Sequence, residues 1–145
     1  MSRWIYCLVL LVAICGPAFS SASSQPVRSK RGMVVSASSI ASEVGANILR
    51  NGGSAIDAIV ATAFAMAVTY PTAGNIGGGG FMVFRAASGE SVAYDFRETA
   101  PAGASPTMFL ANGKYDANLL HNSSISIGVP GTVAGLHLAL SLIHI

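Results

Sequence analysis

The chain has 145 residues, which is enough for one domain at most, and 52% of them are hydrophobic while only 10% are charged. This composition excludes a disordered polypeptide and allows a packed core. The formal net charge is +2, and apart from a basic cluster at Arg28, Lys30 and Arg31 the charges are scattered, which excludes nucleic acid as a partner because no basic face could neutralise many phosphates.

Residues 1–22 have the pattern of a secretory signal peptide. Arg3 supplies the positive flank, an apolar stretch runs from Trp4 to Cys15, and small residues follow it. Because this stretch is shorter than the roughly 20 residues of a membrane span, we expect cleavage and secretion, with an uncleaved anchor on the extracellular face of the membrane as the alternative. Residues 23–31 are predicted to be a linker, and residues 32–145 the folded part.

Both cysteines, Cys7 and Cys15, lie in this leader, so the remaining chain has no disulfide and no thiol nucleophile. A lipoprotein signal is not favoured, because the bulky Ile14 directly precedes Cys15. Asn122 begins the acceptor sequence Asn-Ser-Ser for N-glycosylation, which has meaning only in a chain that enters the secretory route. The alternative is an unmodified polar loop.

The folded part is predicted to begin with a short buried strand at residues 32–36. Apolar residues then recur at helical spacing over residues 39–51, with Ser39 as the N-cap. Gly52 and Gly53 are predicted to end this amphipathic helix, because glycine accepts a left-handed backbone.

A second helix is predicted over residues 55–68, opened by Ser54 as N-cap and by Asp57 as its capping-box partner. It is apolar on almost all sides, yet it is too short and too rich in alanine for a membrane span. We therefore expect the rest of a larger protein to bury it.

The second half of the chain is predicted to be a mixture of strands, turns and helix. Two apolar runs, residues 81–85 and 91–95, flank a Ser-Gly turn and indicate a β-hairpin. Ser105 and Pro106 indicate the start of a short helix, and residues 112–124 are expected to be a loop. A final apolar helix over residues 130–140 runs towards the chain end without a cap, which again suggests that the chain is part of a longer protein.

Four consecutive glycines, Gly77–Gly80, precede the hairpin. They do not form a Walker loop, because Phe81 and Met82 follow instead of Lys and Ser or Thr. They do not form a dinucleotide fingerprint, because a helix precedes them and a strand follows. Two interpretations remain open: a structural turn, and the lining of a pocket where another backbone or a ligand comes close.

Arg97 follows the second strand of the hairpin directly. Its planar, permanently charged guanidinium can bind a carboxylate through two hydrogen bonds, and sites are commonly assembled at strand ends. A salt bridge to Asp95 or Glu98 is the alternative. The other candidates are expected to be structural or solvated, because no histidine flanks the hydroxyls and the histidines lack ligand spacing: Thr99, Thr132, His121, His137 and His144.

Five stretches of the sequence together closely resemble one family. They are residues 32–37 (GMVVSA), 48–61 (ILRNGGSAIDAIVA), 71–82 (PTAGNIGGGGFM), 95–101 (DFRETAP) and 128–135 (GVPGTVAG). In this order they resemble the amino-terminal part of the γ-glutamyltransferases, also called γ-glutamyl transpeptidases or glutathione hydrolases.

The resemblance implies an α+β fold, namely the N-terminal portion of an N-terminal-nucleophile (Ntn) hydrolase αββα sandwich, truncated before the small subunit. It implies a precursor that cleaves itself into a large and a small subunit. The new amino-terminal threonine of the small subunit attacks the γ-glutamyl amide of glutathione or a related compound, and the glutamyl group passes to water or to an acceptor amino acid or dipeptide. No metal and no organic cofactor takes part.

Arg97 matches the arginine that in this family binds the α-carboxylate of the γ-glutamyl group. Glu98 and Thr99 match the motif around it and are expected to support it. The oxyanion hole of the family is built from small-subunit glycines, so the resemblance gives Gly77–Gly80 no such role.

The nucleophilic threonine lies downstream of the matching region in the family, so we expect no catalytic residue in this chain and no activity from it alone. Residues 141–145 fit the family poorly and suggest a truncated or misread gene end. The alternatives are a catalytically silent secreted product and a membrane-anchored interaction module.

Overall fold

The computed structural model describes residues 26–141. The predicted signal peptide and the last four residues lie outside this range, so leader cleavage is not tested, and of the predicted misread end at residues 141–145 only Ser141 is described. The chain divides into two units at Lys30 and Arg31. Residues 26–30 have no regular secondary structure, and every helix and strand described below belongs to the second unit.

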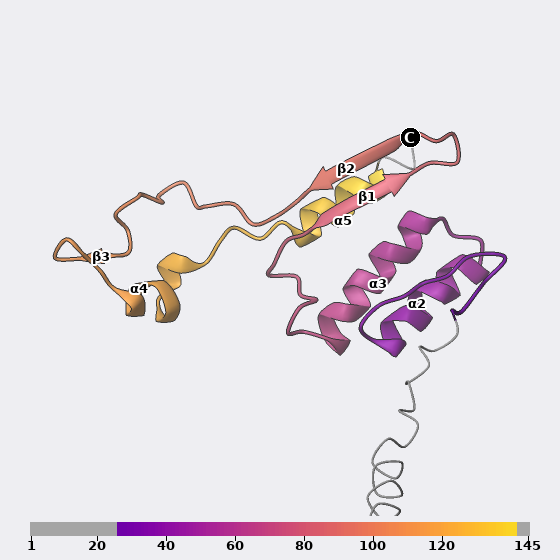
Figure 1. Ribbon diagram of the computed structural model, residues 1–145, viewed down its shortest axis with the longest axis horizontal. Helices are drawn as coiled ribbons and strands as arrows, with labels where there is room; N and C mark the ends of the chain where they lie inside the picture. Colours follow the sequence, from indigo (N-terminus) through magenta and orange to yellow (C-terminus); the bar gives the residue numbers. More distant parts are fainter. Residues whose placement is uncertain (1–25, 142–145) are drawn as a thin grey trace, which may run out of the picture. The chain divides into compact units, whose positions relative to one another are not determined.

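Two helices form an antiparallel hairpin, α2 (Ser39–Arg50) and α3 (Ala55–Thr69), which lie side by side in Figure 1. Small residues make this close contact possible, because Gly45 of α2 lies directly against Thr62 and Ala58 of α3. The Thr62 hydroxyl is buried and donates to the Ala58 carbonyl at 2.7 Å, which satisfies it inside the helix. The two helices predicted from the hydrophobic pattern are thus confirmed.

The N-terminal caps of these helices are only partly as predicted. Ser38, not Ser39, caps α2: it has an extended backbone, and its hydroxyl accepts from the Ala41 N–H at 3.3 Å. Ser54 caps α3 in a complete capping box, since its hydroxyl accepts from the Asp57 N–H at 3.1 Å and Asp57 accepts from the Ser54 N–H at 2.8 Å.

The predicted β-hairpin is confirmed. Strand β1 (Phe81–Arg85) pairs antiparallel with β2 (Ser91–Asp95), so that Phe81 lies opposite Asp95. The pairing continues one step further, because Phe96 and Gly80 exchange two backbone hydrogen bonds of 3.0 and 3.3 Å. This extension fixes the chain just before Arg97.

One face of the hairpin packs on helices α3 and α5 (Thr132–Ser141), and α5 runs alongside the strands in Figure 1. The buried core joins these elements through Ile56, Val60, Met82, Leu136 and Ala139. Side chains alternate along each strand, so the opposite face is exposed within residues 26–141, with Val83 79% exposed. The hairpin therefore has one covered and one uncovered apolar side.

Three elements differ from the prediction. Residues 32–36 form no strand, because a strand needs a hydrogen-bonded neighbour and the described chain gives it none. Ser105 and Pro106 begin turns rather than a helix.

The predicted loop at residues 112–124 instead contains strand β4 (Lys114–Tyr115), which pairs with β3 (Leu110–Ala111) just before it, and helix α4 (Ala117–Asn122); the 3-10 turn η1 (Ser124–Ser126) begins at its end. The turn of the hairpin is made by Asn112 and Gly113, both with positive φ, the pattern that Asn-Gly favours.

The mixture of helices and antiparallel strands fits the predicted α+β class. Within residues 26–141, no helix is long and apolar enough to cross a membrane.

Candidate substrate-binding site

Arg97 lies two residues beyond the end of β2, and its side chain is exposed. Asp95 does not pair with the guanidinium; its carboxylate instead accepts a hydrogen bond from the Arg97 backbone N–H at 3.0 Å. Among the residues that the structure describes, Arg97 forms no ion pair, so the salt bridge to Asp95 or Glu98 that the sequence left open is absent there. The charge of Arg97 is available for a ligand.

An open cavity of about 350 Å³ lies beside this arginine. One wall is formed by Arg97, Glu98 and Thr99, and the other walls are mainly apolar side chains from later segments, among them Met108, Phe109, Ile125 and Ile127. A cation in the wall of a cavity that has both polar and apolar lining residues is an arrangement that suits a small ligand with a carboxylate.

Three of the sequence motifs meet at this place. Thr99 and Val129 exchange backbone hydrogen bonds of 3.2 and 2.8 Å, which joins residues 95–101 to residues 128–135. The carbonyl of Gly78 accepts from the N–H groups of Gly131 and Thr132 at 2.9 and 3.0 Å, which adds the glycine run. The motifs are therefore neighbours in space although they are far apart in the sequence.

Glu98 and Thr99, which are expected to support Arg97, each contact another motif. The exposed Glu98 lies against Gly78 and Gly128, so it is packed between two of the motifs. Thr99 holds the backbone through its bridge to Val129. Thr132 is the first residue of helix α5.

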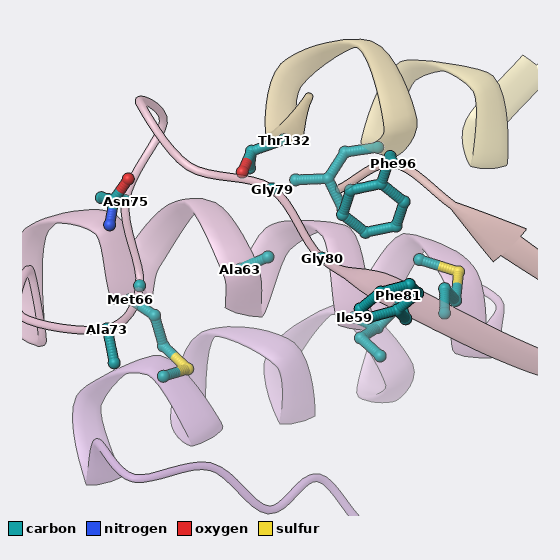
Figure 2. Close-up of a pocket in the computed structure, with 13 residues that line it drawn as sticks. Ile59, Ala63, Met66, Ala73, Asn75, Gly79, Gly80, Phe81, Phe96 and Thr132 are labelled. Atoms are coloured by element: carbon teal, nitrogen blue, oxygen red, sulfur yellow. The ribbon is translucent and has the colours of Figure 1, made fainter. Parts of the chain in front are cut away.

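A second cavity of about 210 Å³ has Phe96, the residue before Arg97, in its lining (Figure 2). Ile59, Ala63 and Met66 of α3 line it together with Gly79, Gly80 and the ring of Phe96. Its lining holds no acidic, basic or histidine side chain, and its polar side chains are Asn75 and Thr132. Gly79 and Gly80 thus line a pocket, and Gly78 and Gly80 make backbone hydrogen bonds to other segments. The glycine run therefore has both features that the sequence left open, a structural role and the lining of a pocket.

The histidines stand apart from the cavity beside Arg97. His121 is exposed on α4 and His137 is exposed on α5, whereas His144 lies outside the described residues. Residues 26–141 contain no group of three or more side chains that could hold a metal ion. Asn122 is exposed at the end of α4, where its side-chain NH₂ donates to Asn118 at 2.8 Å.

Sequence reasoning missed the far walls of the cavity beside Arg97. Phe109, Ile125 and Ile127 carry no motif and lie well beyond Arg97 in the chain. The one usable signal was the motif at residues 128–135, because its pairing with Thr99 brings the residues just before it to the cavity.

Comparison with known proteins decides the family. The family model described as gamma-glutamyltranspeptidase matches residues 41–142. The chain belongs to this family.

The glutathione hydrolase proenzyme of Escherichia coli (strain K12) is 53% identical over 116 residues, which cover 79% of this chain and 20% of the relative. The crystal structure of the Helicobacter pylori γ-glutamyltranspeptidase matches with a TM-score of 0.77 and 48% identity, over 81% of this chain and 34% of that one. The enzyme from Pseudomonas nitroreducens, in complex with L-DON, matches with a TM-score of 0.75 and 46% identity, over 79% of this chain and 34% of that one. The chain thus spans about a fifth of the length of its first curated relative, and the recognised family is one of enzymes.

Proposed function

We propose that this chain is the amino-terminal part of the large subunit of a γ-glutamyltransferase, and that Arg97 holds the α-carboxylate of the γ-glutamyl substrate. One observation carries the proposal: three motifs converge on an arginine that forms no ion pair within residues 26–141 and that lines a cavity of about 350 Å³. Curated relatives named glutathione hydrolase proenzyme support the reaction, and the word proenzyme supports a precursor that is processed.

In the proposed reaction, Arg97 fixes the glutamyl group by its carboxylate so that the γ-amide reaches a threonine of the small subunit. The threonine hydroxyl attacks the amide carbon, its proton passes by way of the threonine α-amino group to the leaving amine, and an acyl-enzyme forms. Water or an acceptor amine then takes the glutamyl group. Glutathione and other γ-glutamyl compounds are the proposed donors, and amino acids or dipeptides the proposed acceptors.

We also propose that residues 26–141 form one part of an αββα sandwich. The uncovered face of the β1–β2 hairpin supports this, because Phe81 and Val83 are 66% and 79% exposed there. The exposed apolar side chains of α3, Ile59 and Phe64, support it too. Such apolar faces are expected to be buried by further segments of the protein.

The test of Arg97 uses a hybrid in which residues 32–140 replace the matching segment of the Escherichia coli relative, because this chain alone spans a fifth of that protein. Arg97→Ala is expected to lower kcat/KM for a γ-glutamyl anilide by about a hundredfold, since hydrogen bonds to a charged group contribute about 1.5–3 kcal/mol each. Arg85→Ala is the matched control, because Arg85 is an exposed arginine at the end of the neighbouring strand. A loss of kcat/KM of less than about tenfold in Arg97→Ala, or an equal loss in the control, would rule out Arg97 as the clamp, that is, as the group that binds the substrate carboxylate.

The 145-residue chain by itself is proposed to be inactive, because Thr99 and Thr132 have no base to activate them. Hydrolysis of the anilide by the purified chain, above the rate of an Arg97→Ala version, would contradict the proposal that the nucleophile lies outside these residues and would favour a complete active site within them.

Secretion is a separate proposal, supported by the composition of residues 1–22 and by the exposed Asn122. Amino-terminal sequencing of protein recovered from the medium of a eukaryotic host tests it.

A further inference from the structure

Arg97 lies on a short segment whose backbone is fixed at both ends. On one side Phe96 and Gly80 exchange hydrogen bonds of 3.0 and 3.3 Å, and on the other side Thr99 and Val129 exchange bonds of 3.2 and 2.8 Å. Only Arg97 and Glu98 lie between these two anchors. The direction in which the Arg97 side chain leaves the backbone therefore depends on what holds these two residues.

Asp95 acts on Arg97 directly. Its Oδ1 atom accepts from the Arg97 backbone N–H at 3.0 Å, which is the local pattern of an Asx turn. A carboxylate is a stronger acceptor for an N–H than a neutral oxygen. Asp95 is exposed and makes no ion pair with the guanidinium, so its contact orients the backbone and leaves the positive charge available.

Gly79 faces the same segment from the glycine run. A Cβ atom at this position would lie 2.6 Å from the Glu98 nitrogen and 2.8 Å from the Arg97 carbonyl carbon. Such distances are too short for any side chain, and the atoms in the way are backbone, so only glycine lets the two chains approach this closely. Gly77 is different, because a Cβ there would meet only the Asn75 side chain, at 3.7 Å.

We propose that Asp95 and Gly79 are positioning residues for Arg97. Asp95 accepts the hydrogen bond of the Arg97 backbone N–H, and Gly79 allows the glycine run to pack against the peptide bond between Arg97 and Glu98. The inference rests on the proposed role of Arg97 in binding the substrate carboxylate and goes beyond it, because neither Asp95 nor Gly79 lines the cavity beside Arg97. A charged group that is displaced by about 1 Å binds its ligand and positions it for reaction much less well. A change at Asp95 or Gly79 is therefore expected to lower activity by displacing Arg97.

The first test is a double-mutant cycle in the hybrid enzyme. Asp95→Ala is expected to lower kcat/KM for the γ-glutamyl anilide by about tenfold, mainly through a higher KM, because the clamp holds ground state and transition state alike. In the Arg97→Ala background the same change is expected to have less than about a twofold effect, since there is no guanidinium left to orient. Asp95→Asn keeps an acceptor oxygen and is expected to stay within about threefold of the parent.

The outcomes separate the two proposals. Equal losses from Asp95→Ala in both backgrounds would overturn the positioning role, because Asp95 would then support the fold in general. If Arg97→Ala lowers kcat/KM by about a hundredfold and Asp95→Ala does not lower it, the positioning role of Asp95 is overturned, whereas the proposed role of Arg97 is unaffected. A loss of less than about tenfold in Arg97→Ala would remove the clamp and this inference with it.

The second test compares two glycines of the same run. Gly79→Ala is expected to raise KM for the anilide by at least about fivefold, whereas Gly77→Ala is expected to change it by less than about twofold. The melting temperature of each variant reports its folding. Equal KM values in the two variants would overturn the role of Gly79, and if Gly79→Ala gives no soluble enzyme, the Asp95 cycle decides the proposal.

Discussion

The helical hairpin and the segment around Arg97 are held together by different kinds of contact. In the hairpin the decisive hydrogen bonds join near neighbours in the sequence, as between Ser54 and Asp57. Around Arg97 they join distant segments, as between Thr99 and Val129 or between Gly131 and Gly78. The capping bonds of the helical hairpin can therefore form within one short segment, whereas the backbone bonds around Arg97 form only when distant motifs meet.

The largest expected effect comes from a change that separates those motifs. A Cβ atom on Gly131 would lie 2.0 Å from the Phe96 carbonyl oxygen. Neither residue can easily move away, because the backbone of each is hydrogen-bonded to the glycine run. Gly131→Ala is expected to destabilise the hybrid enzyme by about 3 kcal/mol or more, seen as a lower melting temperature or as loss of soluble protein.

Gly103→Ala is the matched control for this change. Nothing lies within 4 Å of a Cβ atom at Gly103, so its effect is expected to be within about 0.5 kcal/mol. Equal melting temperatures for the two variants would mean that the approach of residues 96 and 131 does not matter to the fold.

A smaller effect is expected from the local contacts of the hairpin. Ser54→Ala removes the cap of α3 and is expected to cost about 1 kcal/mol. Because the contact is local, the loss should be seen as faster hydrogen exchange in the first turn of α3, with no change in KM. Ser39→Ala, on an exposed serine that does not cap α2, should leave exchange unchanged; a KM change in Ser54→Ala would show that the two regions are coupled.

The smallest effect is expected at the exposed ion pair on α2. Arg50 binds Glu43 and also donates to Asn47 at 2.9 Å, but the two paired side chains are 54% and 62% exposed. Arg50→Ala is expected to cost less than about 1 kcal/mol, and high salt should reduce the difference further. A salt-independent loss above that value, measured by melting the hybrid, would place this surface pair among the main contacts of the hairpin.

The same contrast explains what could be predicted from the sequence. The two helices over residues 39–51 and 55–68, the Ser54 cap and the β1–β2 hairpin follow from local patterns, and the structure confirms them. Even the error at Ser39 is local, because adjacent serines compete for one cap and only the backbone decides between them.

The failures concern residues whose structure depends on distant partners. Residues 32–36 have the pattern of a strand but no neighbour to pair with in the described chain. The walls of the cavity beside Arg97 depend on the bridge between Thr99 and Val129, which no local pattern encodes. The hairpin at Asn112 and Gly113 is different, because its Asn-Gly turn signal is present in the sequence, within the stretch predicted to be a loop.

The uncovered face of the β1–β2 hairpin has a consequence for biosynthesis. During translation residues 81–95 leave the ribosome before α5, which covers part of their buried face, so both apolar faces and the strand edges are open to other chains for a time. Phe81 and Val83 are therefore expected to be contacts for a chaperone until other parts of the protein cover them. Aggregation is therefore expected to be most probable between the synthesis of this hairpin and the synthesis of α5, which packs on it.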